Sequence, residues 1–180
     1  RQGHTTRVDE SQPVPSTLVS EAARTLITFS GVTILPDIPE YYRKYPALLN
    51  FLSAQKMPWR ESRTLAGEIG EYIVMMRETD DAYLVGAATN ESGRMIDLPL
   101  SFLEKGKYTV EVIEDGDDAH YLTNRESLKT TTRQLTNNDK LTLKLAPGGG
   151  ACLVIKKTPS MRVREQATFP LVSPSEKMNA

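Results

Sequence analysis

Apolar residues recur along the first part of the chain with the period of a helix. Between residues 18 and 29 they fall at every third or fourth position, which predicts an amphipathic helix that Ser16 caps and Gly31 ends. Residues 32–35 form a short β-branched run, which predicts a buried strand, and a second helix is expected to begin at Pro46. This order of helix, strand and helix describes an α/β fragment that is too small to close its own sheet.

The period falls to two after Trp59. Apolar and polar residues then alternate in short segments about ten residues apart, with Gly, Asn, Asp and Pro between them. This arrangement is typical of an antiparallel β-sandwich. Asp80 and Asp81 are expected to form a hairpin turn, and residues 114–130 a longer loop. The predicted strands cover residues 72–76, 83–87, 96–102, 108–112, 141–145 and 151–155.

The overall charge excludes two classes of partner. The 180 residues carry 22 Lys and Arg against 23 Asp and Glu, a net charge of −1. This balance gives no electrostatic reason to expect binding to nucleic acid or to a membrane surface. No apolar run approaches the roughly 20 residues that span a bilayer. The chain starts at Arg1 without a targeting pattern, so we expect it to begin inside a longer gene product.

Few residues are suited to cysteine or histidine chemistry. Cys152 is the single cysteine, which excludes an internal disulfide and a cysteine-based zinc site. Because it falls within a predicted strand, we expect it to be a small core residue. His4 and His120 are too far apart in sequence to indicate a metal site, and no Ser/His/Asp or Cys/His set can be assembled.

Three carboxylates are candidates for a functional role. Asp37 follows the predicted strand 32–35, the position that faces the substrate in a β/α barrel, so it is a candidate substrate-binding residue. The alternative is that an aspartate after a proline only initiates a turn. Glu68 and Glu71 could form the carboxylate pair that glycoside hydrolysis requires. Nothing near them would raise the pKa of one acid, so a solvated sheet edge is the better interpretation.

Two loop motifs each have an ordinary interpretation. Asp115, Asp117 and Asp118 offer the clustered oxygens that calcium prefers, but they do not match the twelve-residue calcium loop, and we expect a solvated loop. Residues 146–150, Ala-Pro-Gly-Gly-Gly, are not a phosphate loop because the Gly-Lys-Ser/Thr ending is missing and a strand follows. A sharp turn between the last two strands is expected there, since glycine permits positive φ.

The order of several short motifs is more specific than any one of them. Together they resemble the C-terminal part of glycoside hydrolase family 97, the family of calcium-dependent α-glucosidases and related α-galactosidases. The resemblance covers roughly residues 14–157, and the segments 67–72 and 145–150 are its most distinctive parts. The matching segments are Gly-Val-Thr-Ile-Leu-Pro-Asp-Ile-Pro at 31–39, Tyr-Pro at 45–46, Met-Pro-Trp-Arg-Glu-Ser-Arg at 57–63, Gly-Glu-Ile-Gly-Glu-Tyr-Ile at 67–73, Leu-Ser-Phe-Leu at 100–103, Gly-Lys-Tyr at 106–108 and Leu-Ala-Pro-Gly-Gly-Gly at 145–150.

The resemblance implies a mixed fold, in which the C-terminal fragment of a (β/α)8 barrel precedes an antiparallel β-sandwich. Residues 1–58 would supply the last barrel elements (the seventh helix, the eighth strand and the last helix), and residues 59–157 the sandwich. Residues 158–180 go beyond the family pattern and are expected to be an extension or a disordered tail.

The resemblance also implies a function for the full-length protein. It would be a glycoside hydrolase that cleaves α-glucosidic or α-galactosidic bonds in oligosaccharides, with calcium as cofactor and a bacterial periplasmic or secreted location. The family's catalytic and calcium-binding glutamates would lie upstream of Arg1, so no catalytic or metal residue is assigned and the chain alone is expected to be inactive. Its partners would be the upstream part of the same polypeptide and, in a homo-oligomer, further copies.

Two alternatives remain open. The chain could be a non-catalytic carbohydrate-binding or structural, oligomer-forming β-sandwich module. Sugar-binding faces usually expose several aromatic residues, and the single tryptophan, Trp59, counts against a lectin-like role but not against an interaction domain. The chain could also belong to another glycosidase family that combines a barrel with a sandwich.

Overall fold

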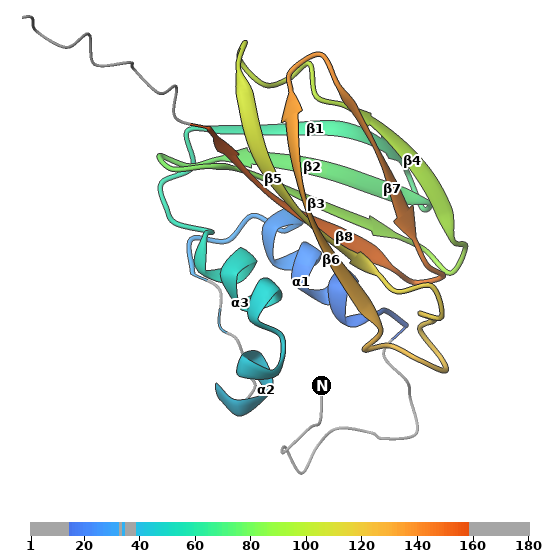
Figure 1. Cartoon of the computed structure of the whole chain (residues 1–180). Coiled ribbons are helices and arrows are strands. Elements are labelled where there is room, and N and C mark those ends of the chain that lie inside the picture. The colour runs from blue at the N-terminus through green and yellow to red at the C-terminus, as the bar shows by residue number, and fades with distance from the viewer. Residues whose placement is uncertain (1–14, 33, 35–38, 159–180) are drawn as a thin grey trace, which may run out of the picture.

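The computed structural model describes residues 15–32, 34 and 39–158. Three short helices come first, and eight strands follow within this part of the chain (Figure 1). The helices are α1 (Leu18–Ile27), α2 (Pro39–Lys44) and α3 (Pro46–Ser53). The strands are β1 (Glu61–Glu68), β2 (Tyr72–Glu78), β3 (Tyr83–Thr89), β4 (Arg94–Pro99), β5 (Lys107–Asp115), β6 (Leu128–Thr136), β7 (Lys140–Leu145) and β8 (Gly150–Lys157). No helix in the described part is long and apolar enough to cross a membrane.

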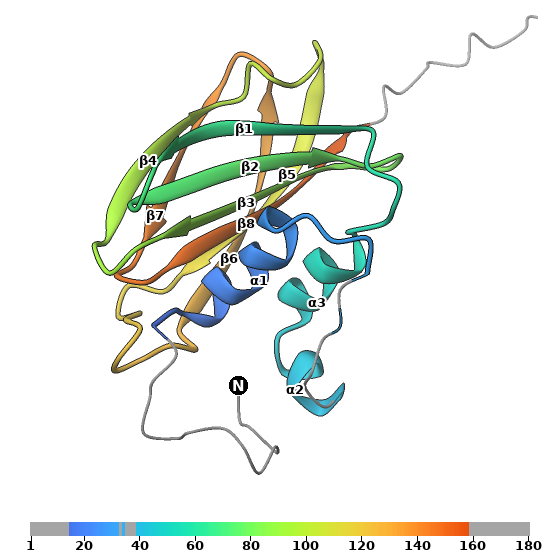
Figure 2. The ribbon, with the colours of Figure 1, turned by 180° about the vertical axis from the view of Figure 1, so that it is seen from behind.

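The strands form two antiparallel sheets. Six of them pair in the order β1-β2-β3-β8-β5-β6, and β4 pairs with β7 in a separate two-stranded sheet. The two-stranded sheet lies over one face of the larger sheet, whereas α1 and α3 lie over the other face, as Figure 2 shows from behind. The described residues therefore form a mostly antiparallel β domain with a few short helices.

The core between the two sheets follows from strict alternation. On β4, Ile96 and Leu98 are buried while Asp97 is exposed, and on β7 Leu141 and Leu143 are buried in the same way. These side chains pack against the inward-facing residues of β2, β3, β5 and β8 in one apolar cluster. A strand with one buried face needs this period of two, which is why the sequence pattern located these strands correctly.

A second apolar cluster lies between the helices and the large sheet. Strand β8 is buried on both faces along most of its length, so Leu153 faces the sandwich core while Cys152 faces α1. Cys152 is completely buried, which confirms the prediction of a core residue, and burial raises the pKa of its thiol well above the usual value. A side chain at Gly86 of β3 would meet the Ala23 carbonyl oxygen at 2.9 Å, so glycine allows α1 to approach the sheet.

The start of α1 differs by one residue from the expectation. Thr17, rather than Ser16, is the N-cap, because its Oγ1 accepts a hydrogen bond from the Ser20 N–H at 3.2 Å. The Ser16 hydroxyl instead donates to the Glu21 carboxylate at 2.5 Å. The second predicted helix begins at Pro46 as expected.

The six predicted strands are confirmed, but β1 and β6 were missed. The loop expected at residues 114–130 is shorter, since β5 extends to Asp115 and β6 begins at Leu128. Of the predicted strand 32–35, Val32 and Ile34 are described, and both are exposed and lie outside any strand. The rest of that segment lies outside the described residues, and the division into barrel, sandwich and tail stays a prediction.

Candidate functional site

No catalytic or metal-binding constellation occurs in the part of the chain that the structure describes. No group of three or more His, Cys, Asp or Glu residues there could hold a metal ion. Asp37 lies outside the described residues, so its role in substrate binding stays a prediction. Two clusters of converging polar residues connect separate elements of the fold, one at a hairpin tip and one at the N-terminus of α1.

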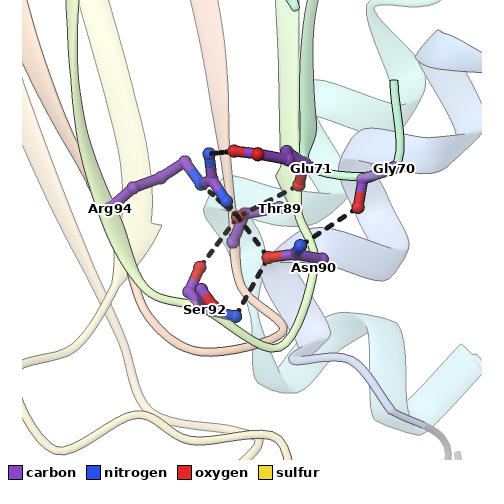
Figure 3. A network of polar contacts seen from close by, with 6 residues as sticks. All are labelled: Gly70, Glu71, Thr89, Asn90, Ser92 and Arg94. Atoms are coloured by element: carbon purple, nitrogen blue, oxygen red, sulfur yellow. Dashed lines mark hydrogen bonds and ion pairs between the residues drawn. The ribbon is translucent and has the colours of Figure 1, made fainter. Parts of the chain in front are cut away.

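The first cluster, here called the hairpin-tip network, surrounds Arg94 at the start of β4 (Figure 3). Its guanidinium donates to Thr89 Oγ1 at 2.7 Å and to Asn90 Oδ1 at 3.1 Å, and it forms an ion pair with the Glu71 carboxylate at 2.9 Å. The same guanidinium lies 4.9 Å from the centre of the Tyr72 ring. The network comprises Gly70, Glu71, Thr89, Asn90, Ser92 and Arg94.

The network fixes the β1–β2 turn against the connection between β3 and β4. The Asn90 side chain donates to the Gly70 carbonyl at 3.0 Å, and Gly70 has a φ of +80°, which favours glycine in this turn. Because Glu71 is committed to Arg94 and Glu68 is exposed, the two glutamates do not form an acid–base pair. The sequence Gly-Glu-Ile-Gly-Glu-Tyr is therefore explained by a rigid tip, which presents a fully exposed Ile69.

The second cluster, here called the Asp115 junction, joins α1 to the sandwich. The Asp115 carboxylate accepts hydrogen bonds from the Thr17 hydroxyl at 2.7 Å and from the backbone N–H groups of Ala146 and Gly150 at 3.0 and 2.8 Å. Only 1% of Asp115 is exposed, and burial raises the pKa of this carboxyl, while the three hydrogen bonds act in the opposite direction. A single carboxylate thus binds the side chain of the N-cap residue of α1 and the backbone of the turn between β7 and β8.

The glycines at 148–150 are required by this junction. A side chain at Gly149 would lie 1.9 Å from Asp115 Oδ2, and Gly148 has a φ of +65°. The Gly148 carbonyl also accepts a hydrogen bond from the Thr17 N–H at 2.9 Å. The expected sharp turn is confirmed, and its backbone N–H groups bind an internal carboxylate.

The neighbouring aspartates turn away from Asp115. Asp117 pairs with Lys144 at 2.8 Å, which lowers the pKa of this carboxyl. Asp118 accepts hydrogen bonds from Ser127 and Asn124, and the Ser127 hydrogen bond lowers its pKa in turn. The three carboxylates therefore face different partners and do not converge on one point.

Arg77 forms a third contact between the sheet and α1. Its guanidinium donates to the carbonyl oxygens of Leu26 and Ile27 at 3.2 and 3.1 Å, at the end of the helix, where cations are favoured. It also lies 4.4 Å from the centre of the Trp59 ring. Trp59 borders a cavity of about 170 Å³ between α1 and α3, which is too small for an oligosaccharide. The cavity is lined by Thr25, Ser30, Gly31, Leu52, Gln55, Met57 and Trp59.

Sequence comparisons relate the chain to larger enzymes. It is 35% identical over 127 residues to the retaining alpha-galactosidase of Bacteroides thetaiotaomicron, and this match covers 71% of this chain and 19% of that protein. It is 25% identical over 139 residues to a probable retaining alpha-galactosidase of Streptomyces bingchenggensis, covering 77% of this chain and 20% of that protein. The chain therefore spans about a fifth of the length of these curated relatives.

Solved structures and a family model agree with this relationship. A glycoside hydrolase family 97 enzyme from Pseudoalteromonas sp. strain K8, solved in complex with acarbose, matches with a TM-score of 0.76 and 30% identity over 81% of this chain and 23% of that chain. A beta-arabinopyranosidase structure matches with a TM-score of 0.61 at 22% identity, over 78% of this chain and 21% of that chain, and shares the fold. The family described as "Glycosyl-hydrolase 97 C-terminal, oligomerisation" matches residues 58–156. The chain therefore belongs to the C-terminal domain family of the glycoside hydrolase family 97 enzymes.

Proposed function

We propose that the full-length protein is a glycoside hydrolase that cleaves α-galactosidic bonds with retention of configuration, and that this chain is its C-terminal, oligomer-forming part. The observation that carries the proposal is the 35% identity to a retaining alpha-galactosidase, which extends over 127 residues. The two-step course would need a nucleophilic carboxylate and an acid–base carboxylate about 5 Å apart. Both would come from the upstream part of the polypeptide.

α-Glucosides are the second candidate substrate. The structural relatives at 30% identity include a family 97 enzyme in complex with acarbose and a variant of it in complex with panose. The residues that would distinguish galactosides from glucosides are expected upstream, together with the catalytic carboxylates.

The contribution of this chain would be mechanical. The Asp115 junction fixes α1 to the sandwich, and Arg77 holds the other end of the same helix. In the proposed enzyme, α1 would belong to the catalytic barrel, so these contacts would hold the barrel and the sandwich in one orientation.

Calcium and location are part of the same proposal. In this proposal calcium is bound by glutamates of the upstream part of the polypeptide, and the described residues of this chain hold no group of three or more His, Cys, Asp or Glu residues suited to a metal ion. A periplasmic or secreted location would bring the enzyme to its oligosaccharide substrates.

The test is an assay of the longest natural form of the protein on aryl α-galactosides and aryl α-glucosides, before and after calcium is chelated and restored. Proton NMR of the first product would give the stereochemical course. Calcium-dependent cleavage of the α-galactoside, with an α-anomer formed first, is expected.

Other outcomes would change the assignment. Cleavage of the α-glucoside alone would select the second substrate. If the folded protein cleaves neither with calcium present, the non-catalytic oligomerisation module becomes the better description. The 180-residue chain should be inactive on both substrates, and activity from it alone would contradict the upstream placement of the catalytic carboxylates.

A further inference from the structure

Strand β6 is an edge strand whose central residues are exposed. It pairs with β5 over nine residues in an unbroken register, from Lys107 opposite Thr136 to Asp115 opposite Leu128. Within the described residues no strand pairs with its outer edge. The central five residues, 130–134, are exposed, so this part of β6 is covered on neither face.

The opposite edge of the sheet is protected in a way that β6 is not. Strand β1 has an irregular register between Thr64 and Ala66 and carries charges at Glu61, Arg63 and Glu68. Bulges and charged side chains are devices that prevent edge strands from pairing with other chains. Strand β6 has neither a bulge nor a proline, and its centre is the threonine run 130–132.

The charges on β6 are few, and one of them is neutralised within the chain. Lys129 lies 3.1 Å from the Glu114 carboxylate and 3.9 Å from that of Asp117, so its charge is compensated on its own subunit. Arg133 is the second cation on the strand. The positions of these two residues decide how β6 could pair with a copy of itself.

We infer that β6 pairs antiparallel with β6 of a second copy, across a two-fold axis at Thr132, and joins the two large sheets edge to edge. The inference rests on the proposed function, since it assigns the interface of the family described as a C-terminal oligomerisation domain. In a strand pair related by a two-fold axis, even-numbered residues lie opposite even-numbered ones and odd-numbered residues opposite odd-numbered ones. With the axis at Thr132, all nine residues of β6 are paired.

The alternative registers are disfavoured by charge. Shifting the axis to Thr131 would place Lys129 opposite Arg133, and shifting it to Arg133 would place two arginines opposite each other. Like charges directly opposite destabilise a strand pair. With the axis at Thr132, Arg133 faces Thr131 of the second copy, and Lys129 faces Leu135.

A disulfide cross-link tests the register directly. In the full-length protein, Thr132→Cys would place two thiols opposite each other with Cα atoms about 4.5–5.5 Å apart, within the range of a disulfide. Thr130→Cys is the matched control: it is exposed on the same strand, but its two copies would lie about 14 Å apart along the strand direction. Cys152 is fully buried and contributes no background from this domain.

We expect Thr132→Cys to give a covalent dimer on non-reducing gels after mild oxidation, and Thr130→Cys and the parent protein to give none. Absence of the Thr132→Cys dimer, or a stronger dimer from Thr130→Cys, would overturn the inference. A monomeric parent protein in sedimentation velocity would also overturn it.

A charge substitution tests the same pairing without a new bond. Thr132→Lys would place two cations opposite each other at the axis and should raise the dimer dissociation constant by roughly tenfold or more. Thr131→Glu would create two equivalent pairs of a carboxylate with Arg133, one on each side of the axis. It should lower the dimer dissociation constant by about two- to tenfold relative to Thr131→Gln. No change in the dissociation constant with both substitutions would contradict the pairing.

Activity on the aryl glycosides, measured on the same samples, separates this inference from the proposed function. A cleaving enzyme that stays monomeric would refute the β6 interface alone. A dimer cross-linked at Thr132 that cleaves neither substrate would refute the proposed activity alone.

Discussion

The two faces of the six-stranded sheet are covered by different structures. On one face the β4–β7 sheet covers the apolar side chains with regular alternation, and its own outer face carries polar pairs such as Lys140 with Asp97. On the other face, α1 and α3 cover a second apolar cluster, and α1 is also held by buried polar groups at both ends. Val32 and Ile34, which follow α1 in the chain, are 77% and 82% exposed.

This difference indicates which face is complete. The sandwich core needs nothing beyond the described strands, because its large side chains are buried. The helical face combines polar junctions with exposed apolar residues, which is the composition expected of a surface that packs against further protein. In the proposed enzyme that protein would be the upstream part of the barrel.

The largest effect is expected at the Asp115 junction. Asp115→Ala would leave the buried N–H groups of Ala146 and Gly150 without their acceptor and remove the contact with Thr17. We expect the free energy of unfolding to fall by about 2–5 kcal/mol, since each unsatisfied buried donor costs about 1–3 kcal/mol. Urea unfolding followed by circular dichroism would measure the loss.

Asp117→Ala is the matched control for this substitution. Its carboxylate is 82% exposed and makes surface ion pairs only, so a change within about 0.5 kcal/mol is expected. If both variants unfolded at the same urea concentration as the parent protein, the junction would not stabilise the helical face.

The Asp115 junction also shows where sequence reasoning stops. The pattern located six of the eight strands, such as β4 and β8, and placed Cys152 in the core, because a strand with one or two covered faces has a visible period or a continuous apolar run. Asp115 and Thr17 are 98 residues apart, and nothing in the local sequence of either indicates the other. The glycines at 148–150 were the available signal, since they imply a close approach to some other group.

The failure to predict β1 and β6 from the sequence has a different cause. Strands β1 and β6 are the two edges of the sheet, and most of their side chains are exposed. Alternation appears in a sequence only where one face is buried, so Thr-rich and charged segments such as 128–136 give no period-two signal. The backbone pairing that defines these strands is supplied by their neighbours β2 and β5.

A smaller effect is expected at the hairpin tip, on the sandwich side of the comparison. Arg94→Ala would remove hydrogen bonds to Thr89 and Asn90 and the contact with the Tyr72 ring. Because the Arg94 side chain is only 18% exposed, we expect a loss of about 1–3 kcal/mol in the free energy of unfolding.

Arg63→Ala provides the control, since Arg63 pairs with Glu61 on the exposed face of β1 and should contribute less than about 0.5 kcal/mol. Equal losses from the two arginine variants would mean that the tip is no more rigid than an ordinary surface. Hydrogen exchange at Gly70 and Glu71 should rise in Arg94→Ala alone.

The exposed apolar residues beside α1 sharpen the comparison further. The double variant Val32→Ser and Ile34→Ser should change the stability of the 180-residue chain by less than about 0.5 kcal/mol, because both side chains are exposed. In the full-length protein we expect a loss of about 1–2 kcal/mol, since covering such side chains contributes free energy.

Met95→Ser serves as the control, because Met95 is also exposed but lies on the outer face of β4. It should leave both forms unchanged. An identical response of the short and full-length proteins to the double variant would show that the helical face is not covered by upstream residues. Differential scanning calorimetry on both forms would make the comparison.

The smallest effect expected is a pH dependence at the same junction. Burial raises the pKa of Asp115 in the folded protein above the usual 3.8, so the folded state retains this proton at pH values where the unfolded chain has lost it. The stabilising contribution of this proton is complete below pH 3.8 and is lost as the pH rises through the folded-state pKa. The surface aspartates act oppositely: Lys140 lowers the pKa of Asp97, so its contribution is lost on acidification.

The slope of Asp115 can be isolated with Asp115→Asn, which removes the titrating group at that position. The difference in unfolding free energy between the parent and this variant should fall as the pH is raised from 3.8, while the corresponding difference for Asp97→Asn should rise with pH. A difference for Asp115→Asn that grows with pH would mean that the three hydrogen bonds to the carboxylate outweigh its burial. The N-terminus of α1 would then be held by a charged carboxylate, in addition to the apolar packing that both faces of the sheet share.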